Sequence, residues 1–181
     1  MKKILALGVC AVALFAVTAS AQKPVTVGGA PMYPNKNIIE NAVNSKDHTT
    51  LVAAVKAAGL VDTLQGPGPF TVFAPVNDAF AALPAGTVDN LLKPESKGTL
   101  TAVLTYHVVP GRLNSQALSR LIKQGNGKAS LKTVQGEELW VSMNGDKIAI
   151  TDAKGGMATV SIANVNQSNG VIHVIDKVLM P

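Results

Sequence analysis

The chain has 181 residues, of which 47% are hydrophobic and 15% charged, and its 16 basic against 11 acidic residues give a formal net charge of +5 at pH 7. The densest basic stretch, Arg112–Lys132, spreads five charges over 21 residues and contains no aromatic side chain. Nucleic-acid binding needs a denser basic footprint with aromatic side chains for stacking, so the composition argues against a nucleic-acid partner.

The first 21 residues have the three-part pattern of a cleavable secretory signal peptide. Lys2 and Lys3 precede an apolar run over Ile4–Val17, and the small residues of Thr18–Ala21 provide an A-x-A cleavage site. The run has 14 residues, whereas a membrane-spanning helix needs about 20. We therefore expect export to a periplasm or the extracellular space, with no membrane span after cleavage. Cleavage also removes Cys10, the one cysteine, so the mature chain can form no internal disulfide.

The part that remains after cleavage suits a single domain of about 160 residues. Residues 22–36 contain three prolines and two glycines without apolar periodicity, which predicts a flexible leader. The ordered domain is then expected over residues 37–181. It opens with a helix over Asn37–Val43, and apolar residues at helical spacing predict a second helix over Leu51–Ala58, which Gly59 ends as a C-cap. Candidates for the N-cap of the second helix lie in Asp47–Thr50.

The middle of the chain alternates one strand with several short helices. Gly66–Pro69 predicts a turn, and the β-branched and aromatic residues of Phe70–Ala74 predict a strand after it. Asn77 or Asp78 is expected to cap a short helix over Ala79–Leu83. Further helices are predicted over Thr87–Leu92, over Glu95–His107, and from a Ser115 cap through Ile122.

The last third of the chain consists of short alternating runs separated by turns, which is typical of strands. Asn144-Gly145 indicates a two-residue hairpin turn with positive φ at both positions. Helices followed by strands predict an α+β fold with an antiparallel sheet rather than a doubly wound one. The predicted strands are Ser130–Val134, Leu139–Met143, Lys147–Thr151, Ala158–Ile162 and Val171–Val178.

Three segments together resemble the signatures of fasciclin-like domains. Gly68–Pro75, followed by Asn77–Phe80 and Leu83-Pro84, resembles the first signature of that family. Leu104–Gly111 is similar to its central Tyr-His motif, and Asn169–Pro181 is similar to its second signature. The three occur in the order and at the spacing of the family, and the resemblance covers about residues 37–181.

The resemblance implies a wedge of two β-sheets packed with a bundle of short helices. It also implies a non-enzymatic role in cell-surface or extracellular-matrix adhesion, with an extracellular protein or glycan as partner. A single copy behind a signal peptide resembles small secreted bacterial members, and we expect this chain to be a monomer. The chain contains no Arg-Gly-Asp, so integrin binding is not carried over. The candidate binding residues are Asn77 and Asp78 of the first signature and Tyr106 and His107 of the Tyr-His motif.

The histidines also allow a purely structural interpretation. His107 and His173 lie on apolar faces of predicted elements, where a histidine is usually a buried, hydrogen-bonded structural residue. With His48 they lack the local spacing of a metal site, and no G-x-S-x-G elbow is present. We therefore expect no metal, no cofactor and no catalytic residue.

One alternative function concerns the predicted sheet. Trp140, Met143 and Met157 could line an apolar groove, and the protein would then carry a small hydrophobic ligand such as a pigment or lipid. In the structural interpretation Trp140 is half-buried on the sheet, whereas Phe70, Phe73, Phe80 and Tyr106 belong to the core.

Overall fold

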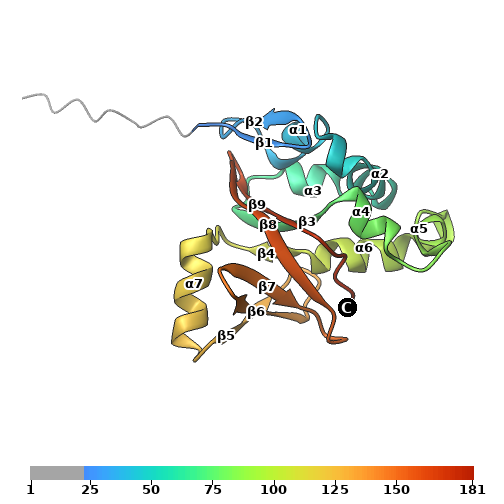
Figure 1. The fold of residues 1–181 in the computed structure, drawn as a ribbon. Coiled ribbons are helices and arrows are strands. Elements are labelled where there is room, and N and C mark those ends of the chain that lie inside the picture. The colour runs from blue at the N-terminus through green and yellow to red at the C-terminus, as the bar shows by residue number, and fades with distance from the viewer. Residues whose placement is uncertain (1–22) are drawn as a thin grey trace, which may run out of the picture.

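The computed structural model describes residues 23–181, so the predicted signal peptide lies outside the described part of the chain. Figure 1 shows helices α1 to α6 gathered on one side of the central strands, and α7 beside the strands at the other end. None of the described helices is long and apolar enough to cross a membrane. The helices are α1 (Ile38–Ala42), α2 (Thr49–Ala58), α3 (Val61–Gln65), α4 (Asn77–Ala81), α5 (Thr87–Leu91), α6 (Lys97–Tyr106) and α7 (Ser115–Gln124), with 3-10 turns η1 (Lys46–His48) and η2 (Pro94–Ser96). The strands are β1 (Val25–Val27), β2 (Ala30–Met32), β3 (Phe70–Pro75), β4 (Val108–Pro110), β5 (Lys128–Lys132), β6 (Glu138–Asn144), β7 (Lys147–Thr151), β8 (Met157–Gln167) and β9 (Gly170–Ile175).

Seven strands form one continuous sheet in the order β4-β3-β9-β8-β7-β6-β5. Strand β8 shifts register against β9 twice, between Val160 and Val165. Such bulges bend a strand, so β8 serves both halves of the sheet, which form the two layers of the wedge. The α+β class and the fasciclin-like wedge are confirmed. The antiparallel expectation holds except for β3 and β9, which pair in parallel.

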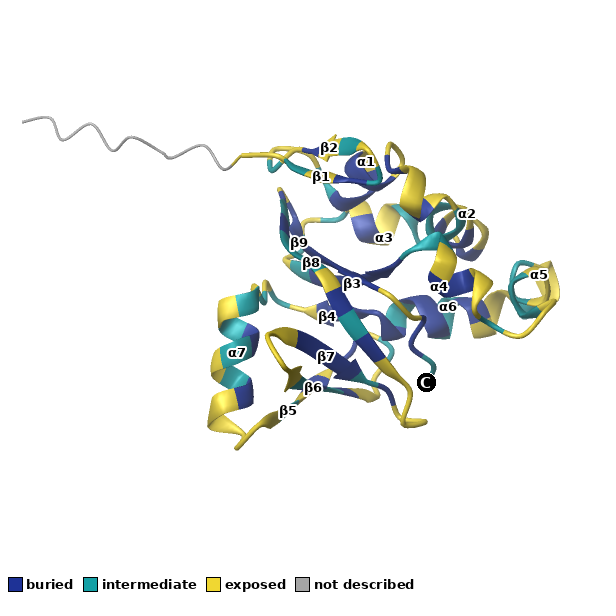
Figure 2. Ribbon diagram, in the orientation of Figure 1, coloured by how far each residue is buried: buried dark blue, intermediate teal, exposed yellow. Residues whose placement is uncertain are grey.

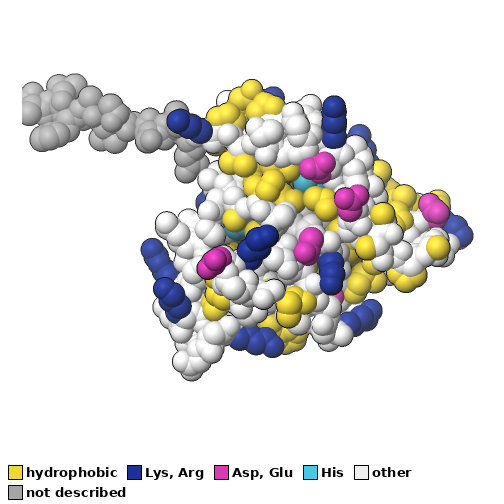
Figure 3. Space-filling view, viewed as in Figure 1, with side chains coloured by type: hydrophobic (Ala, Val, Ile, Leu, Met, Phe, Trp, Pro, Cys, Tyr) yellow, Lys and Arg dark blue, Asp and Glu magenta, His cyan; other side chains and the backbone are white. Residues whose placement is uncertain are grey.

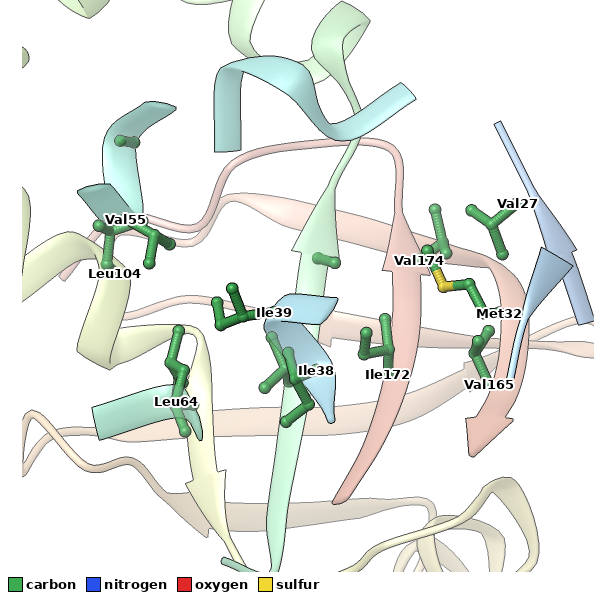
Figure 4. Packing of buried hydrophobic residues seen from close by; sticks show 14 of the residues in the cluster. Val27, Met32, Ile38, Ile39, Val55, Leu64, Leu104, Val165, Ile172 and Val174 are labelled. Atoms are coloured by element: carbon green, nitrogen blue, oxygen red, sulfur yellow. The ribbon is translucent and has the colours of Figure 1, made fainter. Parts of the chain in front are cut away.

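Two hydrophobic cores lie on opposite sides of β3 and β9. The first core is enclosed by α1, α2, α3, α6 and one face of these strands, and Figure 4 shows part of it. The second core packs the other face against β5 to β8 and α7. Every residue of β9 is therefore buried, and its sequence is nearly continuous in apolar residues, as expected for a strand covered on both faces. In Figure 2 these central strands are dark blue, whereas α5, which has no buried residue, lies at the exposed edge.

The segment expected to be a flexible leader is instead part of the domain from Val25 onward. Strands β1 and β2 form an antiparallel hairpin, and Val27 and Met32 are each only 1% exposed in the first core. The loop between the strands is Gly28-Gly29, with φ of 58° and 75°, the pattern of a type I′ turn. Asn41 holds the end of the hairpin through both backbone groups of Tyr33, at 2.9 and 2.8 Å. The prolines in this segment led to the prediction of a flexible leader, although the segment contains two strands of three residues each.

Most predicted helix ends are confirmed, but the cap of α7 differs from the expected one. Asn37 forms a capping box with Glu40, and Gly59 ends α2 with φ of 72°. Asn114, rather than Ser115, caps α7, because its side chain accepts a hydrogen bond from the backbone of the first turn. The hairpin between β6 and β7 is also present, but its two-residue loop is Gly145-Asp146, with positive φ only at the glycine. The loop lies one residue later than the sequence indicated.

Candidate functional site

Tyr106, the last residue of α6, is fully buried and joins two distant turns. Its hydroxyl donates a hydrogen bond to the Glu138 carbonyl at 2.9 Å and accepts one from the Ala153 amide at 2.9 Å. Burial raises the pKa of the phenol. The residue thus ties the helical part of the fold to the start of β6 and to the turn between β7 and β8.

His107 follows directly and is only 3% exposed. Its Nδ1 lies 2.8 Å from the Val103 carbonyl, and its Nε2 lies 2.9 Å from the Leu179 amide. Since an amide can only donate, Nε2 accepts and Nδ1 carries the proton. Burial lowers the pKa of His107 to about 4. The side chain is a neutral clamp that holds the chain after β9 against α6.

Asp152 completes this clamp, although the sequence did not single it out. It is buried, and one carboxylate oxygen accepts from the Met180 amide at 3.0 Å. The other accepts from the Gly156 amide at 2.7 Å and the Lys154 amide at 3.0 Å, closing the turn before β8. An aspartate in a turn rich in glycine was the available signal, but its tie to the C-terminal segment is not visible in the sequence.

Asn77 caps a helix other than the one expected. The N-cap of α4 is Val76, without a side-chain hydrogen bond. The Asn77 side chain instead accepts from the Thr50 amide at 3.1 Å, at the start of α2, and donates to the Lys46 carbonyl at 2.8 Å. Two sequence-distant helix starts are thereby fastened together. Asp78 beside it is exposed to solvent.

The four predicted binding residues do not form one exposed cluster. Three of the four side chains are committed to internal hydrogen bonds, and within the described residues none of these bonds joins Asn77 to Tyr106 or His107. Only Asp78 offers a free surface group. Their role in binding stays a prediction, whereas their role in holding the fold is visible in the geometry.

The other two histidines are buried as well. His173 has its Nε2 2.8 Å from the Leu113 carbonyl, and its ring stacks on Phe73 with centroids 5.8 Å apart. His48 has its Nδ1 2.9 Å from Ser45 Oγ, while its Nε2 has no hydrogen-bond partner among the described residues. Burial lowers the pKa of both rings. Over residues 23–181, no group of three or more His, Cys, Asp or Glu side chains could hold a metal ion.

The proposed apolar groove of Trp140, Met143 and Met157 does not form. Trp140 is paired with Thr151, and Thr151 with Met157, so these three side chains share the outer face of the sheet. Met143 lies three residues from Trp140 on the same strand and therefore points to the other face. Because alternate residues of a strand point to opposite faces, Met143 and Met157 lie on different faces of the sheet. The prediction that Trp140, Met143 and Met157 line one groove was therefore wrong.

The outer face of β5 to β8 has its own character. Lys128 places its Nζ 5.2 Å from the centre of the Trp140 ring, a cation–π contact that strand pairing creates between residues of different strands. Around this pair lie exposed lysines and hydroxyl side chains. We call this surface the lysine–tryptophan face, and it consists of Lys128, Ser130, Lys132, Glu138, Trp140, Ser142, Lys147, Thr151, Met157 and Thr159.

In the view of Figure 3, acidic and basic side chains are interspersed, and little of any histidine is visible. The surface in this view has no single dense charge patch. This agrees with the scattered charges in the sequence.

Comparison with known proteins places the chain in a family. A model described as "Fasciclin domain" matches residues 46–181. Protein sll1483 of Synechocystis is 47% identical over 176 residues, which cover 97% of this chain and 90% of that protein. Cell surface glycolipoprotein MPB83 of Mycobacterium bovis is 33% identical over 167 residues, which cover 90% of this chain and 68% of that protein.

The fold comparison agrees. The structure of a FAS1 domain pair from the insect cell adhesion molecule Fasciclin I matches with a TM-score of 0.73 at 18% identity, covering 82% of this chain and 52% of that chain. The match concerns the fold alone at this identity. Because the family model spans most of the chain and relatives above 30% identity match along nearly all of it, the chain belongs to the fasciclin family.

Proposed function

We propose that this protein is an exported, monomeric, non-enzymatic attachment domain that binds an acidic glycan outside the cytoplasm through the lysine–tryptophan face. Its family includes a cell surface glycolipoprotein, and its fold is that of a cell adhesion molecule. Both relationships support attachment at a cell surface, and the N-terminal signal pattern supports export.

The observation that carries the proposal is the composition of this face. It presents three lysines against one glutamate, with a half-buried indole between them. Lysines complement the carboxylates or sulfates of an acidic glycan, and such complementarity speeds association and selects the partner. The serine and threonine hydroxyls can both donate to and accept from sugar hydroxyls. The indole supplies apolar area for the C–H face of a sugar ring.

A protein partner fits this surface less well. Protein interfaces are usually anchored by several aromatic or aliphatic side chains in a desolvated centre. The lysine–tryptophan face has one aromatic side chain and one exposed methionine, surrounded by charged and hydroxyl groups. A repetitive, charged and hydroxyl-rich polymer is the chemistry that matches it.

The single tryptophan of the chain makes the test direct. Titration of the mature chain with polygalacturonate or dextran sulfate should change the fluorescence of Trp140, and neutral dextran should not. Binding should weaken as salt rises, because exposed charge pairs are screened within about 8 Å at physiological ionic strength.

Variants that each remove two positive charges distinguish binding at this face from binding that depends only on the overall positive charge. Lys128→Gln combined with Lys132→Gln should abolish binding, whereas Arg120→Gln combined with Lys123→Gln, the matched change on α7, should leave binding intact. Equal losses in both double variants would refute the assignment of the face. A strain lacking the protein should lose surface attachment, and the Lys128/Lys132 variant should fail to restore it. Unchanged attachment in that strain would refute the function itself.

A further inference from the structure

Three Asn-Gly pairs occur in the chain, namely Asn126-Gly127, Asn144-Gly145 and Asn169-Gly170. An asparagine side chain loses its amide most readily in this dipeptide, because glycine has no side chain to keep its backbone nitrogen away from the asparagine Cγ. The dipeptide is the same in all three places, so the sequence does not rank them. The fold, however, places each pair in a different environment.

Loss of the amide requires the backbone nitrogen that follows the asparagine. This nitrogen gives up its proton and attacks Cγ, the bond between Cγ and Nδ2 breaks, and ammonia leaves with that proton. Water then opens the resulting succinimide at either carbonyl and gives aspartate or isoaspartate. Two features therefore protect a pair: a hydrogen bond that keeps the proton on the glycine nitrogen, and contacts that stop the side chain from turning toward it.

Asn169-Gly170 is protected by the contacts of its side chain. Asn169 is only 7% exposed. Its Oδ1 accepts from the Ile38 amide at 3.1 Å, and its Nδ2 donates to the carbonyls of Leu64 and Gly66 at 2.8 and 2.9 Å. The side chain can turn toward the nitrogen of Gly170 only if the start of β9 separates from α1 and α3.

Asn126-Gly127 is exposed, but its glycine nitrogen is engaged. The Gly127 amide donates to the Ile122 carbonyl at 2.8 Å in the turn that follows α7. Asn126 has φ of 54°, so the pair belongs to a tight turn of the kind that closes a helix. The amide must leave its acceptor before the nitrogen can react, which slows the reaction.

Asn144-Gly145 has neither protection. Asn144 is the last residue of β6, and both members of the pair are exposed at the tip of the β6–β7 hairpin, drawn in yellow in Figure 2. The Gly145 amide has no backbone acceptor within residues 23–181. Only the terminal pair of the ladder, Asn144 with Lys147, must open for the side chain to reach the nitrogen. The ends of elements fray at little cost.

We propose that Asn144 is a site of spontaneous deamidation, and that the carboxylate formed there weakens binding at the lysine–tryptophan face. The reaction needs no enzyme, and water is its one co-reactant. The effect on binding rests on the proposed function, whereas the modification itself does not.

The position of Asn144 explains the effect on binding. Asn144 is paired directly with Lys147, and directly opposed residues of an antiparallel pair project to the same face. The new carboxylate therefore lies beside a lysine of the proposed glycan site, with Asp146 next to it in the turn. An acidic glycan is repelled by this tip after the reaction. The isoaspartate product also adds a methylene group to the backbone at the end of β6.

Trypsin separates the three pairs, because lysines bound each of them on both sides. Peptides 124–128, 133–147 and 155–177 contain one pair each. The mature chain is incubated at mildly alkaline pH, and mass spectrometry follows the replacement of an amide NH2 by OH. Peptide 133–147 should convert about fivefold faster than peptide 124–128, the factor that one net hydrogen bond provides. Peptide 155–177 should stay unchanged.

The same incubation in concentrated urea is the control. All three pairs should then react at similar rates, because the contacts that distinguish them are lost. The assignment of Asn144 is overturned if peptide 133–147 stays unchanged in the folded protein, or if the three peptides convert there at equal rates.

Asn144→Asp reproduces the aspartate product and tests the effect on binding. It should lower the affinity for polygalacturonate about two- to fivefold, as expected for one exposed charge. Asn90→Asp adds the same charge on exposed α5, far from β6 and β7 in Figure 1, and should leave the affinity unchanged. Equal affinities of Asn144→Asp and the wild type would overturn the effect on binding. Absence of binding by the wild type would refute the proposed function and this effect with it, whereas mass spectrometry alone decides the modification.

Discussion

Replacing His107 with glutamine should remove most of the acid sensitivity that this side chain gives to the fold. In the folded protein its pKa is lowered to about 4 by burial, whereas an unfolded chain has the ordinary value of 6.5. At about 1.4 kcal/mol for each pKa unit, the difference corresponds to about 3 kcal/mol.

The sign follows from which state binds the proton. Between pH 6.5 and about 4 the unfolded chain takes up a proton at His107 while the folded protein does not, so the free energy of unfolding falls as the pH falls through this window. Above pH 6.5 both states are neutral at this site, and below pH 4 both are charged, so the contribution is flat in both ranges. Protonation of Nε2 also removes the acceptor of the Leu179 amide.

The measurement is urea unfolding at several pH values from 8 to 4, followed by Trp140 fluorescence and by circular dichroism. Coinciding transitions from the two probes establish two-state behaviour. At pH 7 His107→Gln should be less stable than the wild type by about 1–3 kcal/mol, because two good hydrogen bonds are weakened. At pH 4 this deficit should vanish or reverse.

Glutamine is chosen because it stays neutral and keeps both a donor and an acceptor. His48 and His173 are present in both proteins, so their titrations largely cancel in the difference. A stability gap between wild type and variant that stays constant from pH 7 to pH 4 would refute the reasoning, since the proton-linked contribution would then be absent.

Three further substitutions test other contacts by urea unfolding. Tyr106→Phe should cost about 0.5–1.5 kcal/mol, because it removes the hydroxyl that bonds the Ala153 amide and the Glu138 carbonyl; no loss would mean that water replaces the hydroxyl. Asn77→Ala should cost about 1–2 kcal/mol as a lost cap of α2, while Asp78→Ala should stay within about 0.5 kcal/mol; equal effects would contradict the capping assignment. Met32→Ala should cost about 2–5 kcal/mol, and an unchanged stability would show that the N-terminal hairpin is not part of the cooperative fold.

Local features of the fold could be predicted from the sequence because their causes lie within a few residues. Gly59 ends α2, and Asn37 starts α1, through contacts inside a single turn. The order of helices and strands gave the α+β class, and three motifs in register gave the family. The N-terminal hairpin is an exception to this rule. Its Gly28-Gly29 turn signal was present in the sequence, but the neighbouring prolines led to the prediction of a flexible leader.

The candidate site depended on the tertiary structure, because a polar side chain finds its partner by packing and not by sequence distance. The sequence placed His107 on an apolar stripe and favoured a structural role, but its partner in the C-terminal segment is 72 positions away. It placed Asn77 before a helix without showing that the helix it caps is α2. It listed the lysines as scattered, and only the pairing of β5 with β6 brought Lys128 over Trp140.

The sequence by itself determined the export signal pattern, the class of fold, the family and the burial of His107 and His173. The tertiary structure alone decided which polar groups are consumed inside the fold and which remain to bind. Tyr106, His107 and Asn77 are consumed by hydrogen bonds between distant segments. Since a buried polar group must be satisfied by whatever packs beside it, the partner of each such group could be recognised only after every neighbour was in place.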